Sequence, residues 1–204
     1  MRNDGTGMQV FIGWKDEYDS HVTIIDHQHR GILNFINGWY NEVRSKIIQG
    51  VNLVEYMQEK FAYLDYYSKA HLKIEEKMLE LLSGNHGFPE KEYRRHTDIH
   101  NRFIREFMGS MASQFGMLVR ASNQELIENL ATDGLRDVAR WWYSHIKAPS
   151  EKAPAGPDHV YRLYLDLLPA EAKVHLLNDM ILFFENETVN NPNRGAANGL
   201  RRQP

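Results

Sequence analysis

The sequence predicts an all-α fold, namely an antiparallel up-down-up-down four-helix bundle with an irregular N-terminal arm and a C-terminal helical extension. Three observations predict it. Four long stretches carry apolar residues at spacings of three and four, which is the pattern of one helix face. Short segments rich in helix breakers separate these stretches. No stretch shows the alternation typical of a strand, and long helices joined by short connections pack antiparallel.

The first three predicted helices lie at about residues 26–48, 52–82 and 90–116. Residues 83–89 are dense in breakers and are expected to form the second connection, with Pro89 in the first turn of the third helix. Ser122 is the expected N-cap of the fourth helix, whose inward face should include Leu126, Leu130, Trp141 and His145.

Outside the bundle, the pattern changes at both ends of the chain. An aromatic, glycine-containing arm precedes the first helix, and the composition of residues 153–157 is that of a linker. Two apolar pieces follow, of which the second has a stripe of Val174, Leu177, Ile181 and Phe184. This extension either packs on the bundle or offers a surface to a protein partner. We therefore expect four parts: an arm (1–25), the bundle (26–150), a linker with the helical extension (151–189) and a disordered tail (190–204).

Composition excludes several classes of function and of site. The net charge of −3 provides no basic field for nucleic acid or anionic lipid, so neither is an expected partner. No apolar run approaches the roughly 20 residues of a membrane span, and the first residues have no apolar signal region. The absence of cysteine excludes disulfides and thiolate-bound metal, and it fits a cytoplasmic protein. Any transition metal must therefore be bound through nitrogen and oxygen.

Six polar residues fall on the inward faces of the four helices. His71 and Glu75 are four residues apart, and so are His96 and His100, which places each pair on one helix face. A lone histidine on such a face is usually an ordinary core residue, but six such groups in a dry core would leave several polar atoms unpaired, at about 1–3 kcal/mol each. A cation would satisfy them together, and imidazole with carboxylate suits iron, zinc, manganese or copper. The sequence therefore predicts a metal site made of His29, His71, Glu75, His96, His100 and His145.

The other histidines do not share this pattern. They fall in loops, in the extension or on another helix face, and we expect them at the surface: His21, His27, His86, His159 and His175.

Four motifs in order make residues 14–149 resemble the hemerythrins, and among them the bacterial hemerythrin-like domains. Ile25-Asp26-His27-Gln28-His29 is similar to the family's Ile-Asp-x-Gln-His. Tyr67 with the run from His71 to Glu76 resembles its Tyr-x3-His-Phe-x2-Glu-Glu segment. Gly87-Phe88-Pro89 followed by His96 and His100, and then Trp141 with His145-Ile146, resemble the remaining two.

The resemblance implies a non-haem iron centre, with two ions or one, oxo- or hydroxo-bridged, that binds dioxygen reversibly. It assigns the six residues of the predicted site as ligands and makes Glu75 the bridge between two irons. It also implies a second bridging carboxylate, an Asp, at the position that Ser150 occupies here. Three alternatives remain open: Glu151 replaces it through a shift at Pro149, solvent or another anion bridges, or the site holds one metal or two weakly.

Two functions follow from this interpretation. The first is an oxygen-binding protein, for sensing, storage or transport, rather than an enzyme. The alternative is an iron-dependent oxidase, or an enzyme that handles nitric oxide or peroxide, because loss of a bridging carboxylate would open a coordination position. A structural bundle with a decayed site is disfavoured because all six other ligand positions persist.

Overall fold

The described part of the chain comprises residues 2–3, 9–10, 12–50, 52–120, 124–147 and 156–189 of a computed structural model. It is almost entirely helical. Its short elements are β1 (Arg2–Asn3), β2 (Gln9–Val10) and η1 (Asp16–Tyr18), where β1 pairs antiparallel with β2. Its helices are α1 (Thr23–Ile48), α2 (Leu53–His86), α3 (Glu90–Arg102), η2 (Phe103–Met108), α4 (Gly109–Arg120), α5 (Gln124–Ile146), α6 (Pro157–Leu167) and α7 (Ala170–Val189).

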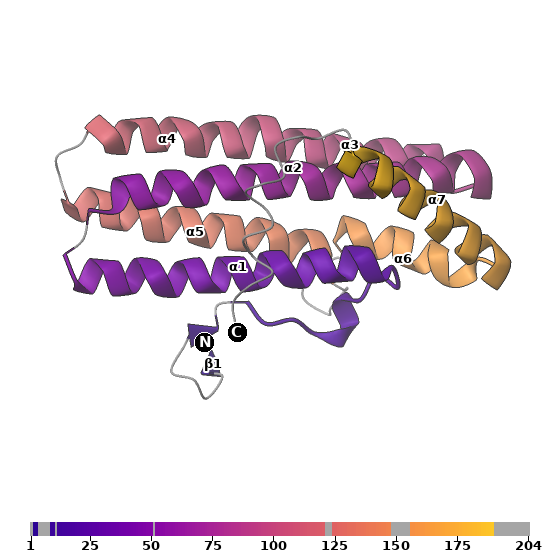
Figure 1. Ribbon diagram of the computed structural model, residues 1–204, viewed down its shortest axis with the longest axis horizontal. Helices are drawn as coiled ribbons and strands as arrows, with labels where there is room; N and C mark the ends of the chain where they lie inside the picture. Colours follow the sequence, from indigo (N-terminus) through magenta and orange to yellow (C-terminus); the bar gives the residue numbers. More distant parts are fainter. Residues whose placement is uncertain are drawn as a thin grey trace.

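Four long helical rods form the bundle, and this confirms the predicted fold class. α1 packs against α2 and α5, while α3, η2 and α4 follow one another as a single rod against α2 and α5 (Figure 1). The six-residue η2 is a π-helical turn in the middle of that rod, which the periodicity did not predict. π-Helical turns often occur near functional sites. Here the turn begins with Phe103, whose ring stacks on Trp141 at 3.6 Å between centroids.

The second helix is longer than predicted. The side chain of Asn52 caps its start by accepting from the Val54 amide. The helix then continues through residues 83–86. The prediction of a loop at 83–89 is therefore wrong for these first four residues. The helix ends at Gly87, which has a left-handed backbone (φ 73°) and donates a hydrogen bond from its amide to the Leu82 carbonyl. These two features make a glycine C-cap. This single cap outweighs the low helix propensity of residues 83–86.

The apolar core has two parts. The larger lies between the four rods, and the smaller, here called the end cluster, lies where the extension meets the bundle. From the bundle and its loops the end cluster contains Val22, Ile25, Ile74, Met78, Leu79, Leu82 and Phe88; from the extension it contains Tyr161, Leu165, Leu176 and Met180. The extension is therefore part of a packed structure.

Two details of the predicted inward faces are wrong. Leu126 is 45% exposed, and its neighbour Ile127 is buried instead. In α7 the predicted stripe of Val174, Leu177 and Ile181 faces solvent, because the helix packs against α2 through residues one position away. A periodic pattern gives the helix, but it does not decide which of two apolar faces is covered.

Polar contacts also join the extension to the rest of the molecule. Tyr164 donates its hydroxyl to the carbonyl of His86, and Arg162 donates to the carbonyl of Glu17 (2.7 Å). His21 of the N-terminal arm forms an ion pair with Asp166 of α6. Figure 1 shows α6 and α7 at one end of the bundle, with α7 laid across the end of α2.

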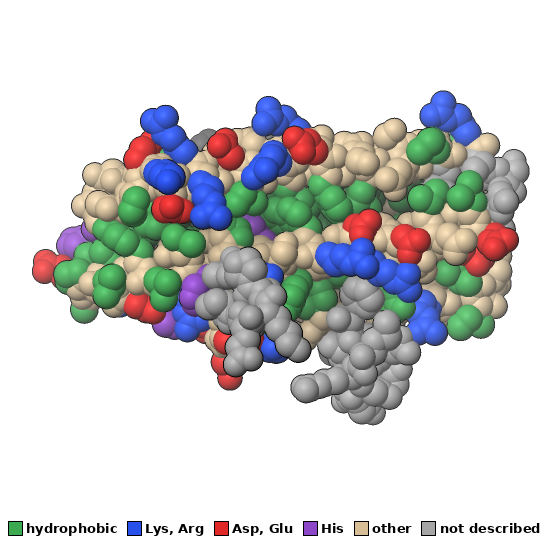
Figure 2. All heavy atoms as spheres, turned by 180° about the vertical axis from the view of Figure 1, so that it is seen from behind, with side chains coloured by type: hydrophobic (Ala, Val, Ile, Leu, Met, Phe, Trp, Pro, Cys, Tyr) green, Lys and Arg blue, Asp and Glu red, His purple; other side chains and the backbone are tan. Residues whose placement is uncertain are grey.

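The surface seen from behind in Figure 2 mixes apolar side chains with charged ones. Exposed apolar residues occur on several elements, among them Ile48, Met117 and Leu167. Among the described residues, none of the helices combines the length and apolar character that crossing a membrane would need.

Candidate metal site

All six side chains of the predicted site converge in one buried place between the four rods. His29 comes from α1, His71 and Glu75 from α2, His96 and His100 from α3, and His145 from α5. His96 is the most exposed of them, at only 4%. The five histidines predicted at the surface lie away from this cluster and are exposed or half-buried.

The nitrogen and oxygen atoms of these side chains form two groups that share Glu75. One group is His29, His71 and Glu75; the other is Glu75, His96, His100 and His145. The two oxygens of Glu75 are divided between them. Oε1 lies 3.3 Å from His29 Nε2 and 3.5 Å from His71 Nε2. Oε2 lies 3.4 Å from His100 Nε2 and 3.3 Å from His145 Nε2.

A second carboxylate has the same arrangement, and the sequence motifs did not point to it. Asp158, at the start of α6, is 3% exposed and reaches both groups. Its Oδ2 lies 3.3 Å from His29 Nε2. Its Oδ1 lies 3.4 Å from His96 Nε2 and 3.1 Å from His145 Nε2. Two carboxylates thus each point one oxygen at each histidine group.

The site leaves buried polar atoms without hydrogen-bond partners among the described residues. They are Nε2 of His29, His71 and His96, Nδ1 of His29 and His145, and both oxygens of Asp158. Of these atoms, the three Nε2 nitrogens and the two Asp158 oxygens lie 3.1–3.5 Å from other nitrogen or oxygen atoms of the cluster. Metal–nitrogen and metal–oxygen bonds of 2.0–2.2 Å at right angles separate neighbouring ligand atoms by about 3 Å, which is the spacing seen here. The residues fit a nitrogen- and oxygen-bound cation.

Hydrogen bonds from neighbouring side chains fix the orientation of three of these side chains. Nδ1 of His71 is bonded to Oε1 of Gln28 (2.9 Å), which leaves Nε2 directed into the site. Nδ1 of His100 is bonded to Glu76 in the same way (3.0 Å). Tyr161 donates its hydroxyl to Oε1 of Glu75 (3.0 Å). Such partners hold the ring orientation and raise the basicity of a ligand.

Burial lowers the pKa of three histidines in the metal-free site. It lowers the pKa of His71 to about 3 and lowers the pKa of both His96 and His145, so these imidazoles are neutral at pH 7. Burial and then the charge of Glu75 raise the pKa of Asp158 well above its usual range. A buried carboxylate without donors is costly. A cation between the groups would remove that cost.

The start of α6 explains how Asp158 reaches the site. Pro157 occupies the first turn, and the Gly156 amide donates to the carbonyl of Lys147 (2.9 Å), which joins α6 to the end of α5. A Cβ at Gly156 would lie 2.1 Å from the carbonyl oxygen of His145, so only glycine fits. Pro149, Ser150 and Glu151, on which the sequence-based alternatives rested, lie outside the described residues.

The sequence contains a signal for this carboxylate. Asp158, Tyr161 and Leu165 recur at helical spacing, and all three are buried. The family pattern expects the carboxylate at a fixed distance after His145, at Ser150. That expectation overlooks Asp158, because it assumes that no residues are inserted between the fourth helix and the carboxylate.

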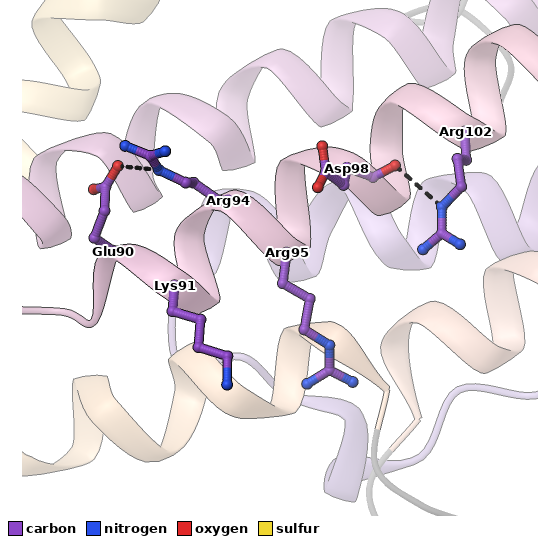
Figure 3. A pocket seen from close by; sticks show the side chains of 6 residues that line it. All are labelled: Glu90, Lys91, Arg94, Arg95, Asp98 and Arg102. Atoms are coloured by element: carbon purple, nitrogen blue, oxygen red, sulfur yellow. Dashed lines mark hydrogen bonds and ion pairs between the residues drawn. The ribbon is translucent and has the colours of Figure 1, made fainter.

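A small hollow adjoins the cluster. A hollow between α3 and α6, lined by His96, Ile99, Pro157 and Val160 among others, measures only about 10 Å³. The open groove of about 490 Å³ in Figure 3 is a different feature. It lies on the charged outer face of α3, where Glu90 pairs with Arg94, and none of its lining residues belongs to the cluster.

Comparisons with known proteins agree with the site. The family model described as "Hemerythrin HHE cation binding domain" matches residues 20–152. The curated bacteriohemerythrins of Pseudomonas aeruginosa strains LESB58 and UCBPP-PA14 are each 25% identical over 134 residues, which is 66% of this chain and 73% of theirs. No solved structure gives a significant match. The family match and the buried histidine–glutamate cluster together support a non-haem iron-binding domain. The chain belongs to the hemerythrin HHE cation-binding family.

Proposed function

We propose that the protein is a non-haem diiron protein that binds dioxygen reversibly, for sensing, storage or transport. The proposed ligands are His29, His71, Glu75, His96, His100 and His145, with Asp158 as the seventh. One observation carries the proposal: both Glu75 and Asp158 direct one oxygen to each histidine group. A carboxylate that serves a single ion has no need of this division.

The two groups also differ in a way that suits ligand binding at one ion. Two imidazoles face one position and three face the other, while the carboxylates contribute equally to both. Iron prefers higher coordination numbers than the two-histidine group supplies. That side is therefore the proposed place for an exchangeable small ligand.

The size of the surroundings favours a diatomic ligand over an organic substrate. The hollow beside His96, which adjoins the three-histidine group, has room for about one water molecule, and the side chains of both groups are buried. Iron would supply the reversible electron transfer on which dioxygen binding depends. The chain excludes bulk water and keeps the His71 imidazole neutral, and the ring of Trp142 against His71 (5.3 Å between centroids) adds an apolar wall.

Asp158 also bears on the enzymatic alternative. That alternative rested on an open coordination position left by a missing carboxylate. Because Asp158 reaches both groups, the absence of Asp at Ser150 no longer favours an oxidase or a peroxide-handling enzyme.

Metal analysis with optical spectroscopy tests the proposal. Protein purified without oxygen should contain two irons per chain, and air should produce a charge-transfer band that disappears under argon. Zinc, or no metal, would contradict the proposal. Rapid turnover with release of peroxide would favour the enzyme instead.

A further inference from the structure

The seventh proposed ligand belongs to the extension rather than to the bundle. α6 and α7 are joined to the bundle by the end cluster, by the hydrogen bonds of Tyr164 and Arg162, and by Asp158. The first two kinds of contact are independent of a metal. The contribution of Asp158 depends on a metal, because its two oxygens lack hydrogen-bond partners among the described residues and would become ligands when a cation is present.

Without a cation, Asp158 opposes docking of the extension. Its carboxylate is buried, both of its oxygens lack a hydrogen-bond donor among the described residues, and Glu75 lies across the same site. Undocking would return this carboxylate to water, where it is fully solvated. With cations in the site, the same oxygens become ligands, and undocking would break those bonds.

The geometry of α6 passes this effect to the whole extension. Asp158 is the second residue of the helix, and Tyr161, one turn later, donates to Glu75. Leu165, a further turn along, lies in the end cluster with Leu176 and Met180 of α7. Because Asp158, Tyr161 and Leu165 share one face of α6, and the end cluster joins that face to α7, a movement of α6 that takes Asp158 out of the site would also displace these contacts.

The ion pair between His21 and Asp166 is too weak to hold the extension by itself. The His21–Asp166 ion pair is 46% and 42% exposed at its two side chains. Exposed pairs of this kind contribute little to stability. The balance between docked and undocked states therefore depends on the end cluster, on the hydrogen bonds of Tyr161, Tyr164 and Arg162, and on Asp158.

We propose that α6–α7 is a metal-dependent latch: metal in the buried site holds the extension on the bundle, and loss of metal releases it. This inference rests on the proposed metal site. By reciprocity, the docked extension raises metal affinity by the same factor by which metal favours docking.

Hydrogen exchange of the full chain measures the latch directly. Amide exchange is compared between chelated protein and protein loaded with Fe²⁺ without oxygen, and bound iron is measured in the same samples. If metal binds only the docked state, a free metal concentration about 100 times the dissociation constant raises the docking equilibrium constant about hundredfold. We therefore expect amide exchange in residues 158–180 to slow at least tenfold. Amides near Trp39, in the buried middle of α1, report general stabilisation of the bundle and should slow less.

Two variants separate the latch from ordinary packing. Asp158→Ala should slow exchange of the extension in the chelated protein, because the buried carboxylate is gone, and should shrink the further slowing caused by iron. Asp166→Asn removes an ion pair on the same helix but away from the site, and should speed exchange equally in both states.

The outcomes distinguish the latch from the proposed metal site. If two irons bind and the exchange of 158–180 does not slow relative to α1, the latch is wrong and the metal site stands. The latch is also wrong if Asp158→Ala behaves like Asp166→Asn. If no iron binds, the metal site is wrong and the latch is wrong with it.

Discussion

Oδ1 of Asp158 lies 3.1 Å from Nε2 of His145, although the two residues belong to different helices and a proline-containing segment separates them in the chain. This contact makes a residue of the extension part of the site in the bundle core. Substitutions at this contact and around it should therefore affect both metal binding and stability.

Asp158→Ala should weaken binding of the second metal by more than the roughly 10–100-fold that loss of an outer-sphere partner costs, because a proposed ligand itself is removed. The iron content per chain should fall below two in a titration followed by elemental analysis. Glu151→Gln is the matched control, since Glu151 was the alternative bridge. If Glu151→Gln lowers the iron content and Asp158→Ala does not, our assignment of the bridge is wrong.

Gly156→Ala should destabilise the protein by about 1–3 kcal/mol, the usual cost of forcing extra atoms into a packed place. The new Cβ would meet the carbonyl oxygens of His145 at 2.1 Å and Ser144 at 2.6 Å, and backbone atoms cannot easily yield. Thermal unfolding measures the effect. Gly38→Ala is the control: it lies within α1 with nothing within 4 Å, so it should raise stability by up to about 1 kcal/mol. Equal effects of the two variants would contradict the close approach.

Gln28→Leu should lower metal affinity about 10–100-fold, because Nδ1 of His71 loses the partner that directs Nε2 into the site. Gln28→Glu keeps an acceptor oxygen and should restore most of the affinity. The neighbouring exposed His27 provides a control as His27→Gln. A competition titration with a chelator compares all four proteins. Unchanged affinity in Gln28→Leu would show that this hydrogen bond does not orient the ligand.

Stability of the metal-free protein should depend on pH through Asp26. Burial, and then its hydrogen bond with Asp19, raise the pKa of Asp26 to about 6. A raised carboxyl pKa means that the folded state binds more protons than the unfolded state, so this contribution is full below about pH 4 and is lost as the pH rises through 6. The melting temperature of Asp26→Asn, measured relative to that of the wild type, should therefore rise by roughly 2–4 °C from pH 4 to pH 7. A constant difference across that range would contradict the shift.

Sequence periodicity could predict the bundle and the convergence of six side chains because both depend on local spacing within a helix. His71 and Glu75 share a face whatever the rest of the chain does. That these side chains hold metal stays a prediction. Asp158 could not be found in this way, because its place depends on the tertiary contact between Gly156 and the end of α5. The prediction that Val174 and Ile181 face inward was wrong for a similar reason, since only packing against α2 decides which face of α7 is covered.

The hydrogen bond between the Gly156 amide and the Lys147 carbonyl fixes both ends of the intervening segment. The position of Asp158 then depends on this junction and not on the number of residues between its ends. Lengthening a chain segment whose ends are already held adds little closure entropy, about 0.6 kcal/mol for each doubling. A peptide tag or a small fluorescent domain inserted after Ser150 should therefore leave the buried site intact, which would make the segment a practical attachment point for an optical reporter.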